Sequence, residues 1–273
     1  EMSASLVGSE MCIRDSYQPR YAGDELPSTP ESLAVALADK IETLTGLFGI
    51  GQLPTGEKDP FALRRHALGI LRLLIEKELP LSLDNLIAIG TEEESVVPGV
   101  KDATEELKQF FHDRLRVMQK DQGFTAHEVE SVIGSEPAIL ADVPKRLKAV
   151  HDFMSLPEAE SLAAANKRIE NILKKNTLPL ADAVDPALLT EKEEKDLYEA
   201  IRTLEPKLEA DYKAGRYEDE LRSLAPLKAP VDAFFDKVMV NAEDEALRRN
   251  RLTLLNELHK AMNQVAKLSC LAS

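Results

Sequence analysis

The sequence predicts an all-helical protein. From Tyr17 onward, apolar residues recur at spacings of three and four, the period of a helix that buries one face. Runs that alternate β-branched or aromatic residues with polar ones, as strands do, are missing. Three segments open with residue pairs typical of a helix N-terminus: Thr29 with Pro30, Thr125 with Glu128, and Thr190 with Glu193.

The periodicity predicts helices at residues 30–47, 61–78, 101–121, 125–133, 141–155, 157–175, 191–214, 217–240 and 243–268. Three prolines, Pro206, Pro226 and Pro230, fall inside these patterns. Each lacks a backbone donor and its ring clashes with the preceding turn, so we expect kinks or short breaks there.

A linker is predicted at residues 93–100, because the stretch GTEEESVVPG combines two glycines, a proline and an acidic cluster. It would separate a helical region at 17–92 from a second one at 101–273. Residues 1–16, EMSASLVGSEMCIRDS, show no regular periodicity and lack the basic head and long apolar core of a secretion signal. They resemble a translated sequencing adaptor, so we expect a non-native leader and exclude it, with Cys12, from the predicted fold.

Composition restricts the function. The chain has 273 residues, of which 44% are apolar, which is enough for a sizeable core. Acidic residues outnumber basic ones 48 to 34, giving a net charge of −14, and this mean field repels phosphate. Any contact with nucleic acid must therefore come from a local basic patch.

Membrane, metal and disulfide classes are not predicted. The apolar run from Leu68 to Ile75 is interrupted by Arg72 and is far shorter than the roughly 18 residues of a membrane span. Two cysteines and five histidines form neither CxxC nor HExxH spacing. We expect a reducing, cytosolic and metal-free protein.

The stretch GIGQLPTGEKDPFALRR, residues 49–65, nearly matches two phosphate-binding motifs. Glu57 stands where a Walker A lysine would be, and Asp59 stands where Ser or Thr would be, so the loop would repel a phosphate. The segment also follows a predicted helix, whereas both motifs follow a strand. We therefore predict a tight turn between helices, with glycines at positive φ.

In the helix that follows, Arg64, Arg65 and Arg72 flank the apolar face. A solvated or ion-paired role is favoured for them over phosphate contact.

An earlier segment, ALADKIETL, places Asp39 on a helix that is predicted to be buried. This segment resembles the helix carrying the last metal-ligand aspartate of HD-type phosphohydrolases. Residues 17–38 contain no histidine, so we expect no catalysis and a buried, hydrogen-bonded Asp39.

The stretch AAANKRIENILKK, residues 163–175, predicts a helix with one apolar side. Asn166, Lys167, Arg168 and Asn171 share much of the other side. Cations hold phosphates and amides can read base edges, so this surface suits a nucleic acid, with a plain solvated face equally compatible.

The last predicted helix carries three arginines. On a helical wheel Arg249 points away from the apolar stripe, Arg248 lies at its edge, and Arg251 falls inside it. Arg251 therefore needs a partner, either Asp232 or Asp236 in a structural ion pair, or RNA in a groove that Arg248 and Arg251 line.

The preceding helix bears on both interpretations. Phe234 is available for stacking if RNA occupies that groove, whereas Phe235, Val238 and Met239 are predicted core residues.

Six segments together resemble one family, in this order: YQPRYAGDELP, ALADKIETLTGLFGIGQ, GEKDPFALRRHALGILR, AAANKRIENILKK, VDAFFDKVMVN and EALRRNRLTLLNEL. They are similar to the carboxyl-terminal part of the β subunit of bacterial-type glycyl-tRNA synthetase. EALRRNRL also resembles the DALR motif of helical anticodon-binding domains, with Glu245 in place of aspartate. The resemblance implies the end of an HD-like helical region at 17–92 and a DALR-like core at about 158–270.

The resemblance further implies an α2β2 enzyme that joins glycine to its tRNA with ATP and Mg. Adenylate chemistry belongs chiefly to the α subunit of that family, so this chain is expected to be a fragment without catalytic residues or a cofactor of its own. It would bind tRNA(Gly), including the anticodon. The candidate tRNA-binding residues are Arg64, Arg65, Asn166, Lys167, Arg168, Asn171, Phe234, Arg248 and Arg251. The alternative from another class is a non-enzymatic helical scaffold that binds protein partners.

Overall fold

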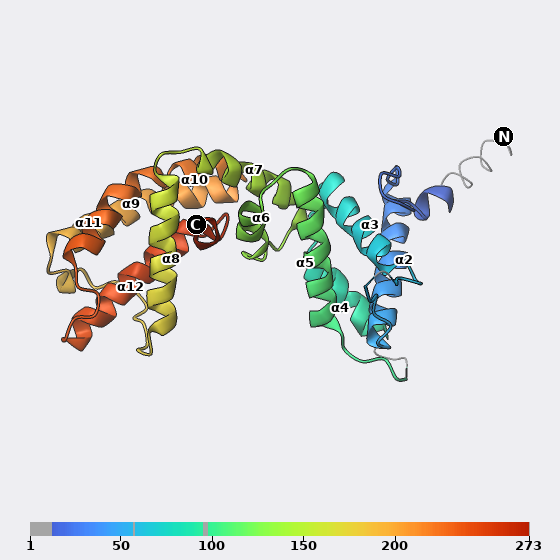
Figure 1. Cartoon of the computed structure of the whole chain (residues 1–273), viewed down its shortest axis with the longest axis horizontal. Coiled ribbons are helices and arrows are strands. Elements are labelled where there is room, and N and C mark those ends of the chain that lie inside the picture. The colour runs from blue at the N-terminus through green and yellow to red at the C-terminus, as the bar shows by residue number, and fades with distance from the viewer. Residues whose placement is uncertain (1–12, 57, 95–97, 273) are drawn as a thin grey trace. The chain divides into compact units, whose positions relative to one another are not determined.

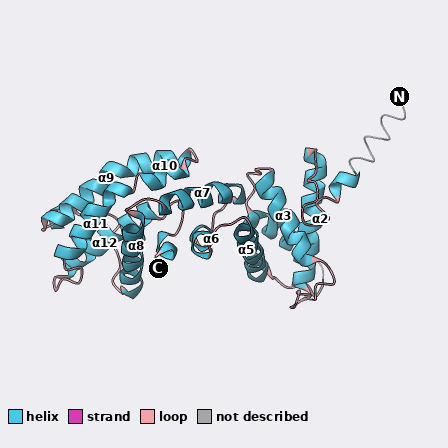
Figure 2. Ribbon diagram, turned by 45° about the horizontal axis from the view of Figure 1, so that its top comes forward, coloured by secondary structure: helices cyan, strands magenta, loops and turns pink. Residues whose placement is uncertain are grey.

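The computed structural model is all-helical over the residues it describes, which are 13–56, 58–94 and 98–272 (Figure 1). Figure 2 shows helices and loops in that part of the chain and no strand. Extended pairing in it is limited to isolated bridges, such as the one between Ser82 and Ile139. The predicted fold class is confirmed. No helix within these ranges is long and apolar enough to cross a membrane.

The chain folds into two compact units. The first extends to Gly123 and includes residues 137–143, and the second contains residues 124–136 and 144 onward. The predicted linker at 93–100 is not the division between them: residues 95–97 lie outside the described residues, and helix α5 (Thr104–Asp121) packs against earlier helices of the first unit. The division therefore follows α5 rather than preceding it.

Helix α2 (Pro30–Gly49) is the centre of the first unit and packs against α3 (Leu63–Glu76), α4 (Leu83–Glu94) and α5. Its start is the predicted one, because the backbone N–H of Ser32 donates to Thr29 Oγ1 at 3.2 Å and Pro30 occupies the first turn. Leu44, Ile70 and Phe111 are among the fully buried side chains of this unit.

Helix α4 was not predicted, because Gly90 resembles a linker residue in the sequence. In the structure Gly90 is helical and faces α2 so closely that a Cβ there would lie 2.8 Å from Thr45 Cγ2. Glycine is thus required by the approach of two helices and does not mark a break.

The connection between α2 and α3 covers residues 50–62, and the positive φ predicted for its glycines is found at two of them, whereas Gly49 is the last residue of α2. Gly51 and Gly56 have φ of 75° and 51°, in the region that favours glycine. The Asp59 carboxylate accepts hydrogen bonds from the backbone N–H groups of Leu63 at 2.8 Å and Arg64 at 3.0 Å, so it caps α3. Glu57 lies outside the described residues.

Two expectations near the amino terminus require correction. Asp39 is exposed, whereas its neighbour Lys40 is buried, because the helix face that packs inward is displaced by one residue. Residues 13–16 form a helical turn, and Asp15, 5% exposed, accepts a hydrogen bond from Ser28 Oγ at 2.7 Å. This end of the predicted leader is therefore packed into the unit; residues 1–12, including Cys12, lie outside the described residues.

The second unit consists of α-helices joined by short 3₁₀ helices. The α-helices that complete the chain are α6 (Ala126–Ile133), α7 (Val143–Met154), α8 (Ala159–Lys175), α9 (Lys192–Lys213), α10 (Tyr217–Arg222), α11 (Lys228–Lys237) and α12 (Glu245–Met262). The 3₁₀ helices are η1 (Leu140–Asp142), which belongs to the first unit, η2 (Pro186–Leu188), η3 (Ala225–Leu227) and η4 (Leu268–Leu271). Helix α8 crosses α12 and also packs against η4, and α9 packs against α11 and α12 (Figure 1).

The prolines act differently from one another. Pro226 lies in η3, between α10 and α11, so the predicted helix 217–240 is broken there. Pro230 lies in the first turn of α11, where a backbone N–H has no intrahelical acceptor. Helix α9 continues through Pro206, with Ile201 and Leu208 buried on either side of it, so packing compensates for the lost hydrogen bond.

Candidate nucleic-acid interface on α8

Helix α8 separates an apolar face from a basic one. Leu162, Ala163 and Ile169 are buried, whereas Lys167 and Arg168 are exposed. The exposed side forms an open groove with the chain's carboxyl-terminal segment. Its lining residues are Ala164, Lys167, Arg168, Asn171, Ile172, Lys175 and Ala272.

The cations of this groove are not neutralised by acidic neighbours. Within the described residues, neither Lys167, Arg168 nor Lys175 has a carboxylate at ion-pair distance. Lys167 Nζ donates to the Ala272 carbonyl at 3.2 Å, which leaves its other N–H groups available. The groove therefore concentrates positive charge in a chain whose net charge is −14.

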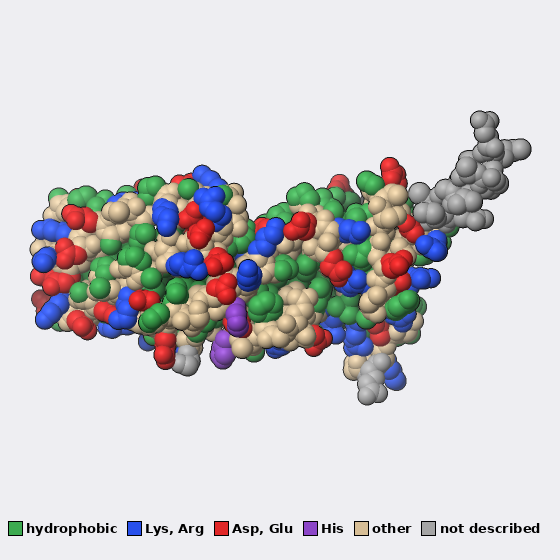
Figure 3. Space-filling view, turned by 90° about the horizontal axis from the view of Figure 1, so that it is seen from above, with side chains coloured by type: hydrophobic (Ala, Val, Ile, Leu, Met, Phe, Trp, Pro, Cys, Tyr) green, Lys and Arg blue, Asp and Glu red, His purple; other side chains and the backbone are tan. Residues whose placement is uncertain are grey.

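Two neighbouring lysines differ from these cations. Lys174 and Lys267 both reach Glu170 Oε1, at 2.7 Å and 3.2 Å. Burial alone would raise the pKa of Glu170, but hydrogen bonds from Lys174, Ser269 and Lys267 hold it at about 2. Acidic and basic side chains are mixed over the surface seen in Figure 3.

An aromatic ring supports the groove. The Arg168 guanidinium lies 4.2 Å from the centroid of the Phe235 ring, a cation–π contact that restricts the arginine's rotamers. The prediction that Phe234 is available for stacking is wrong, because its side chain is fully buried. Its ring packs edge-on against that of Phe235, with 5.6 Å between the ring centroids. Residue 235 rather than 234 thus faces the basic surface, contrary to its predicted place in the core.

The prediction that Asn166 binds tRNA is also wrong. It is 0% exposed, on the packed side of α8, and neither polar atom of its side chain has a hydrogen-bond partner within the described residues. It therefore cannot read a base from the groove. Asn171, one turn further on, is exposed and lines the groove.

Arg251 is part of a buried ion pair. It is 6% exposed and its Nε donates to Glu194 Oε1, while Nη1 donates to the Met239 carbonyl at 2.8 Å. The predicted structural role is supported, but the predicted partners are wrong. Asp232, for example, instead accepts hydrogen bonds from Ser161 and Lys228.

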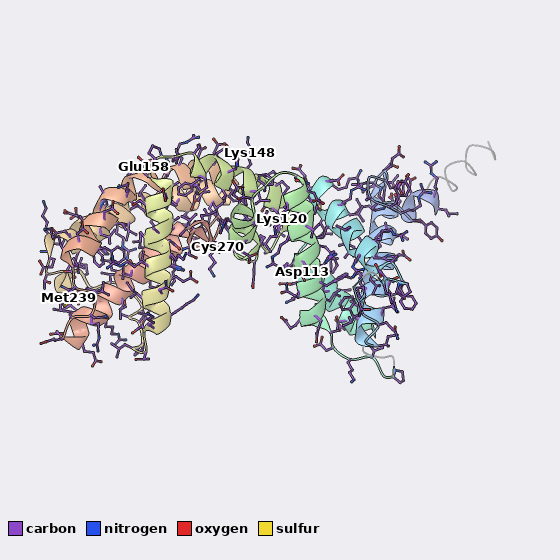
Figure 4. The ribbon with its side chains drawn as sticks, in the orientation of Figure 1. Asp113, Lys120, Lys148, Glu158, Met239 and Cys270 are labelled. Carbon is purple, nitrogen blue, oxygen red and sulfur yellow. The ribbon has the colours of Figure 1, made fainter. Side chains whose placement is uncertain are left out.

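Met239 was predicted in the core, yet its side chain is 72% exposed. It lies at the outer edge of the second unit in the loop after α11 (Figure 4). The carbonyl of this residue serves as an acceptor for Arg251, so its backbone rather than its side chain supports the packing.

The other arginines of α12 do not join the groove on α8. Arg248 is half-buried, its Nε has no hydrogen-bond partner among the described residues, and it is not among the groove's lining residues. Arg249 is exposed, as predicted, and donates to the Leu180 carbonyl at 3.3 Å.

Arg64 and Arg65 belong to the first unit. Arg64 Nη2 donates to the Gly56 carbonyl at 2.6 Å, so it braces the turn before α3. Arg65 is exposed, lines a separate pocket, and has no ion-pair partner within the described residues.

Sequence reasoning missed two residues that shape this region. Lys175 lines the groove. The sequence could have indicated this, because Lys167, Asn171 and Lys175 are spaced by four and therefore share one face of the helix. Asn250 is 3% exposed and binds the loop before α9 through both amide atoms: Asp185 N–H donates to its Oδ1 at 2.8 Å, and its Nδ2 donates to the Asp185 carbonyl at 3.0 Å. No sequence signal marks this contact.

No group of three or more His, Cys, Asp or Glu side chains within the described ranges is placed to hold a metal ion. The groove itself presents cations and the Asn171 amide, which suit binding of phosphates and base edges.

Comparison with known proteins assigns a class to this helical unit. A family model described as "DALR anticodon binding domain" matches residues 162–269, which include every lining residue of the groove except Ala272. The second unit thus carries a helical anticodon-binding domain of the DALR class. A second family model, described as "Glycyl-tRNA synthetase beta subunit", matches residues 10–134.

Curated relatives agree with the second of these matches. The chain is 55% identical over 265 residues to the glycine–tRNA ligase β subunit of Delftia acidovorans, and 54% identical over 270 residues to that of Leptothrix cholodnii. These alignments cover 96% and 97% of this chain and 37% of each relative, so the chain spans little more than a third of their length. The chain belongs to the glycyl-tRNA synthetase β-subunit family.

Proposed function

We propose that this chain is the tRNA-recognising part of a glycine–tRNA ligase β subunit and that the groove on α8 binds the anticodon arm of tRNA(Gly). The observation that carries the proposal is the set of unpaired cations, Lys167, Arg168 and Lys175, inside the DALR domain. Their charges would neutralise phosphates of an unstacked loop, while the Asn171 amide has both a donor and an acceptor for a base edge.

The acidic body of the chain supports selectivity. A net charge of −14 disfavours polyanions in general, so only an RNA whose phosphates match the groove would bind tightly. Glycine anticodons share two cytosines, whose edges amides can read.

The rest of the activity is part of the same proposal. The whole enzyme would use ATP with Mg to attach glycine to tRNA in the cytoplasm, and this chain would act beside an α subunit in an α2β2 assembly. Catalysis would take place outside these 273 residues, which supply recognition and no catalytic group.

A matched pair of lysines tests the groove. Lys175 lines it without an ion pair, whereas the adjacent Lys174 is neutralised by Glu170. We expect Lys175→Gln to weaken tRNA(Gly) binding several-fold and to reduce the slope of log affinity against log salt by about 0.7–0.9. Lys174→Gln should leave both within about a factor of two of the original.

The titration is made by fluorescence anisotropy at two salt concentrations, with tRNA(Gly) and with the same tRNA carrying a changed anticodon. Weaker binding of the changed tRNA is expected. Equal losses in the two lysine variants would show that only bulk charge matters, and equal affinity for the two tRNAs would contradict anticodon recognition. An interaction scaffold would bind neither tRNA.

A further inference from the structure

The first unit contains a buried cation that the proposed function does not use. Lys40 on α2 is 3% exposed, yet no carboxylate among the described residues lies at ion-pair distance from it. Its single hydrogen-bond partner is the Tyr17 carbonyl, at a long 3.5 Å. A buried ammonium with so little compensation is costly, so an anionic ligand beside it would stabilise its charged form.

Helix α3 is shaped to admit this lysine. A Cβ at Gly69 would lie 3.0 Å from Lys40 Cε and 3.2 Å from its Cδ, so the glycine leaves the space through which the lysine stem passes. One turn earlier on α3, His66 Nδ1 is buried and has no hydrogen-bond partner among the described residues. The weakly bonded ammonium of Lys40 on α2 and the unpartnered Nδ1 of His66 on α3 thus belong to side chains that line the same pocket.

These groups border an open pocket of about 290 Å³. Its lining residues are Tyr17, Pro19, Arg20, Asp39, Lys40, Ala62, Arg65 and His66. Tyr17, Pro19 and Arg20 come from the segment YQPRYAGDELP, which takes no part in the proposed RNA groove.

The charges around the pocket favour an anion. Arg20 is paired with Asp24 at 3.0 Å, so Lys40 and Arg65 remain as free cations and Asp39 as the opposing carboxylate. Burial lowers the pKa of Lys40, and Asp39 partly offsets this. Burial and then the charge of Lys40 lower the pKa of His66, which favours the neutral ring, in which one nitrogen carries an N–H.

An apolar groove adjoins the pocket. The two share Pro19 and Arg65, and the groove continues over Tyr21, Leu68 and Val117. An anion bound beside Lys40 would therefore have room for an organic group next to it.

We propose that this pocket binds the phosphate of a small organic phosphomonoester, with Lys40, Arg65 and His66 as donors and the adjoining groove holding the organic part. A phosphate has acceptor oxygens in several directions and carries enough charge to compensate two cations against one carboxylate. The site lies in the first unit and shares no lining residue with the groove on α8.

The test is a calorimetric titration of the 273-residue chain at constant ionic strength with adenosine monophosphate, ribose 5-phosphate, inorganic phosphate and adenosine. We expect the three phosphate compounds to bind, adenosine monophosphate most tightly, and adenosine to bind at least tenfold more weakly than its monophosphate. A dinucleoside phosphate, whose one phosphate is a diester, separates an RNA-backbone source from a monoester; it should bind at least tenfold more weakly too.

Variants locate the binding. Arg65→Gln, on the surface, should weaken adenosine monophosphate binding several-fold, and Lys40→Met, which keeps the buried stem, about tenfold or more. Arg64→Gln removes the same charge from the adjacent position outside the pocket and should change affinity by less than twofold. Adenosine binding as tightly as its monophosphate, a preferred diester, or equal effects of Arg64→Gln and Arg65→Gln would each overturn the proposal.

Discussion

The exposed face of α8 and the packed face of α12 carry similar residue types and use them in opposite ways. In α8, Lys167, Arg168 and Lys175 stand in a groove without carboxylate partners among the described residues. In α12, Arg251 and Asn250 are buried, and each binds a segment that precedes or begins α9. Burial and partners, which the sequence does not display, decide whether such a residue binds a ligand or the protein itself.

The largest expected effect is that of Arg251→Ala, which tests whether Arg251 serves packing rather than RNA binding. Because the change leaves Glu194 buried without its ion-pair partner, we expect the free energy of unfolding to fall by about 3–5 kcal/mol. Urea denaturation followed by circular dichroism measures it, and Arg249→Ala, on the exposed side of the same helix, should cost less than about 0.5 kcal/mol. Unchanged stability with lost tRNA affinity would instead place Arg251 in an RNA site.

A buried carboxyl tests the same principle through pH. Glu220 on α10 is 0% exposed, and neither of its oxygens has a hydrogen-bond partner within the described residues. Burial, and then the charge of Asp211, raise its pKa to about 8, although Arg146 opposes the shift. Between pH 4.5 and 8 the folded chain therefore holds a proton that the unfolded chain has released, so this group makes stability fall as pH rises.

Glu220→Gln removes that dependence, because the amide stays neutral. Relative to the original chain, we expect the variant to gain about 2–4 kcal/mol of unfolding free energy between pH 5 and pH 8. Denaturation curves at both pH values measure the difference. The contrary result is a variant whose stability changes with pH in parallel with the original chain.

Asn250→Ala addresses the loop contact of α12. It removes two hydrogen bonds and leaves the N–H of Asp185 without an acceptor, while the Asp185 carbonyl still accepts from the Leu188 N–H at 3.1 Å, so we expect a loss of about 1–3 kcal/mol. Thermal unfolding measures this loss. Asn171→Ala, on the exposed face of α8, is the matched control and should affect tRNA binding and not stability.

The smallest expected effect concerns the ring beneath Arg168. Phe235→Leu keeps an apolar side chain but removes the cation–π contact, so tRNA affinity should fall by about 0.5–1 kcal/mol, or two- to fivefold. Tyr198→Leu removes a similar contact from Arg202, 5.1 Å from that ring, and should leave tRNA affinity unchanged. Equal losses in both variants would indicate a general structural effect.

Much of the fold could be predicted because capping and periodicity are local. Thr125 and Glu128 form the predicted capping box, and α6 begins immediately after Thr125. At α9 the cap is displaced by one residue, because Glu194 rather than Glu193 accepts from the Glu191 N–H at 2.8 Å. The largest error was the missed helix α4. Its Gly90 resembles a linker residue in the sequence, whereas glycine is needed there because α2 packs closely against it, and no local sequence pattern reveals that contact.

The candidate site could be predicted only in part. Lys167, Arg168 and Asn171 lie together as their helical spacing indicates. Phe234 and Asn166 do not, because a displacement of one residue around a helix exchanges a buried side chain for an exposed one. The partner of Arg251 lies 57 residues earlier in the chain, a contact that only the tertiary fold creates.

Glu194 joins the start of α9 to the middle of α12, two places that are distant in sequence. One of its oxygens accepts from the backbone at the start of α9, and the other accepts from Arg251 in the middle of α12. Opening the first turn of α9 therefore also exposes a charge held by α12, so the two segments should unfold locally as one cooperative unit. Hydrogen exchange would then report equal protection for the amides at both places.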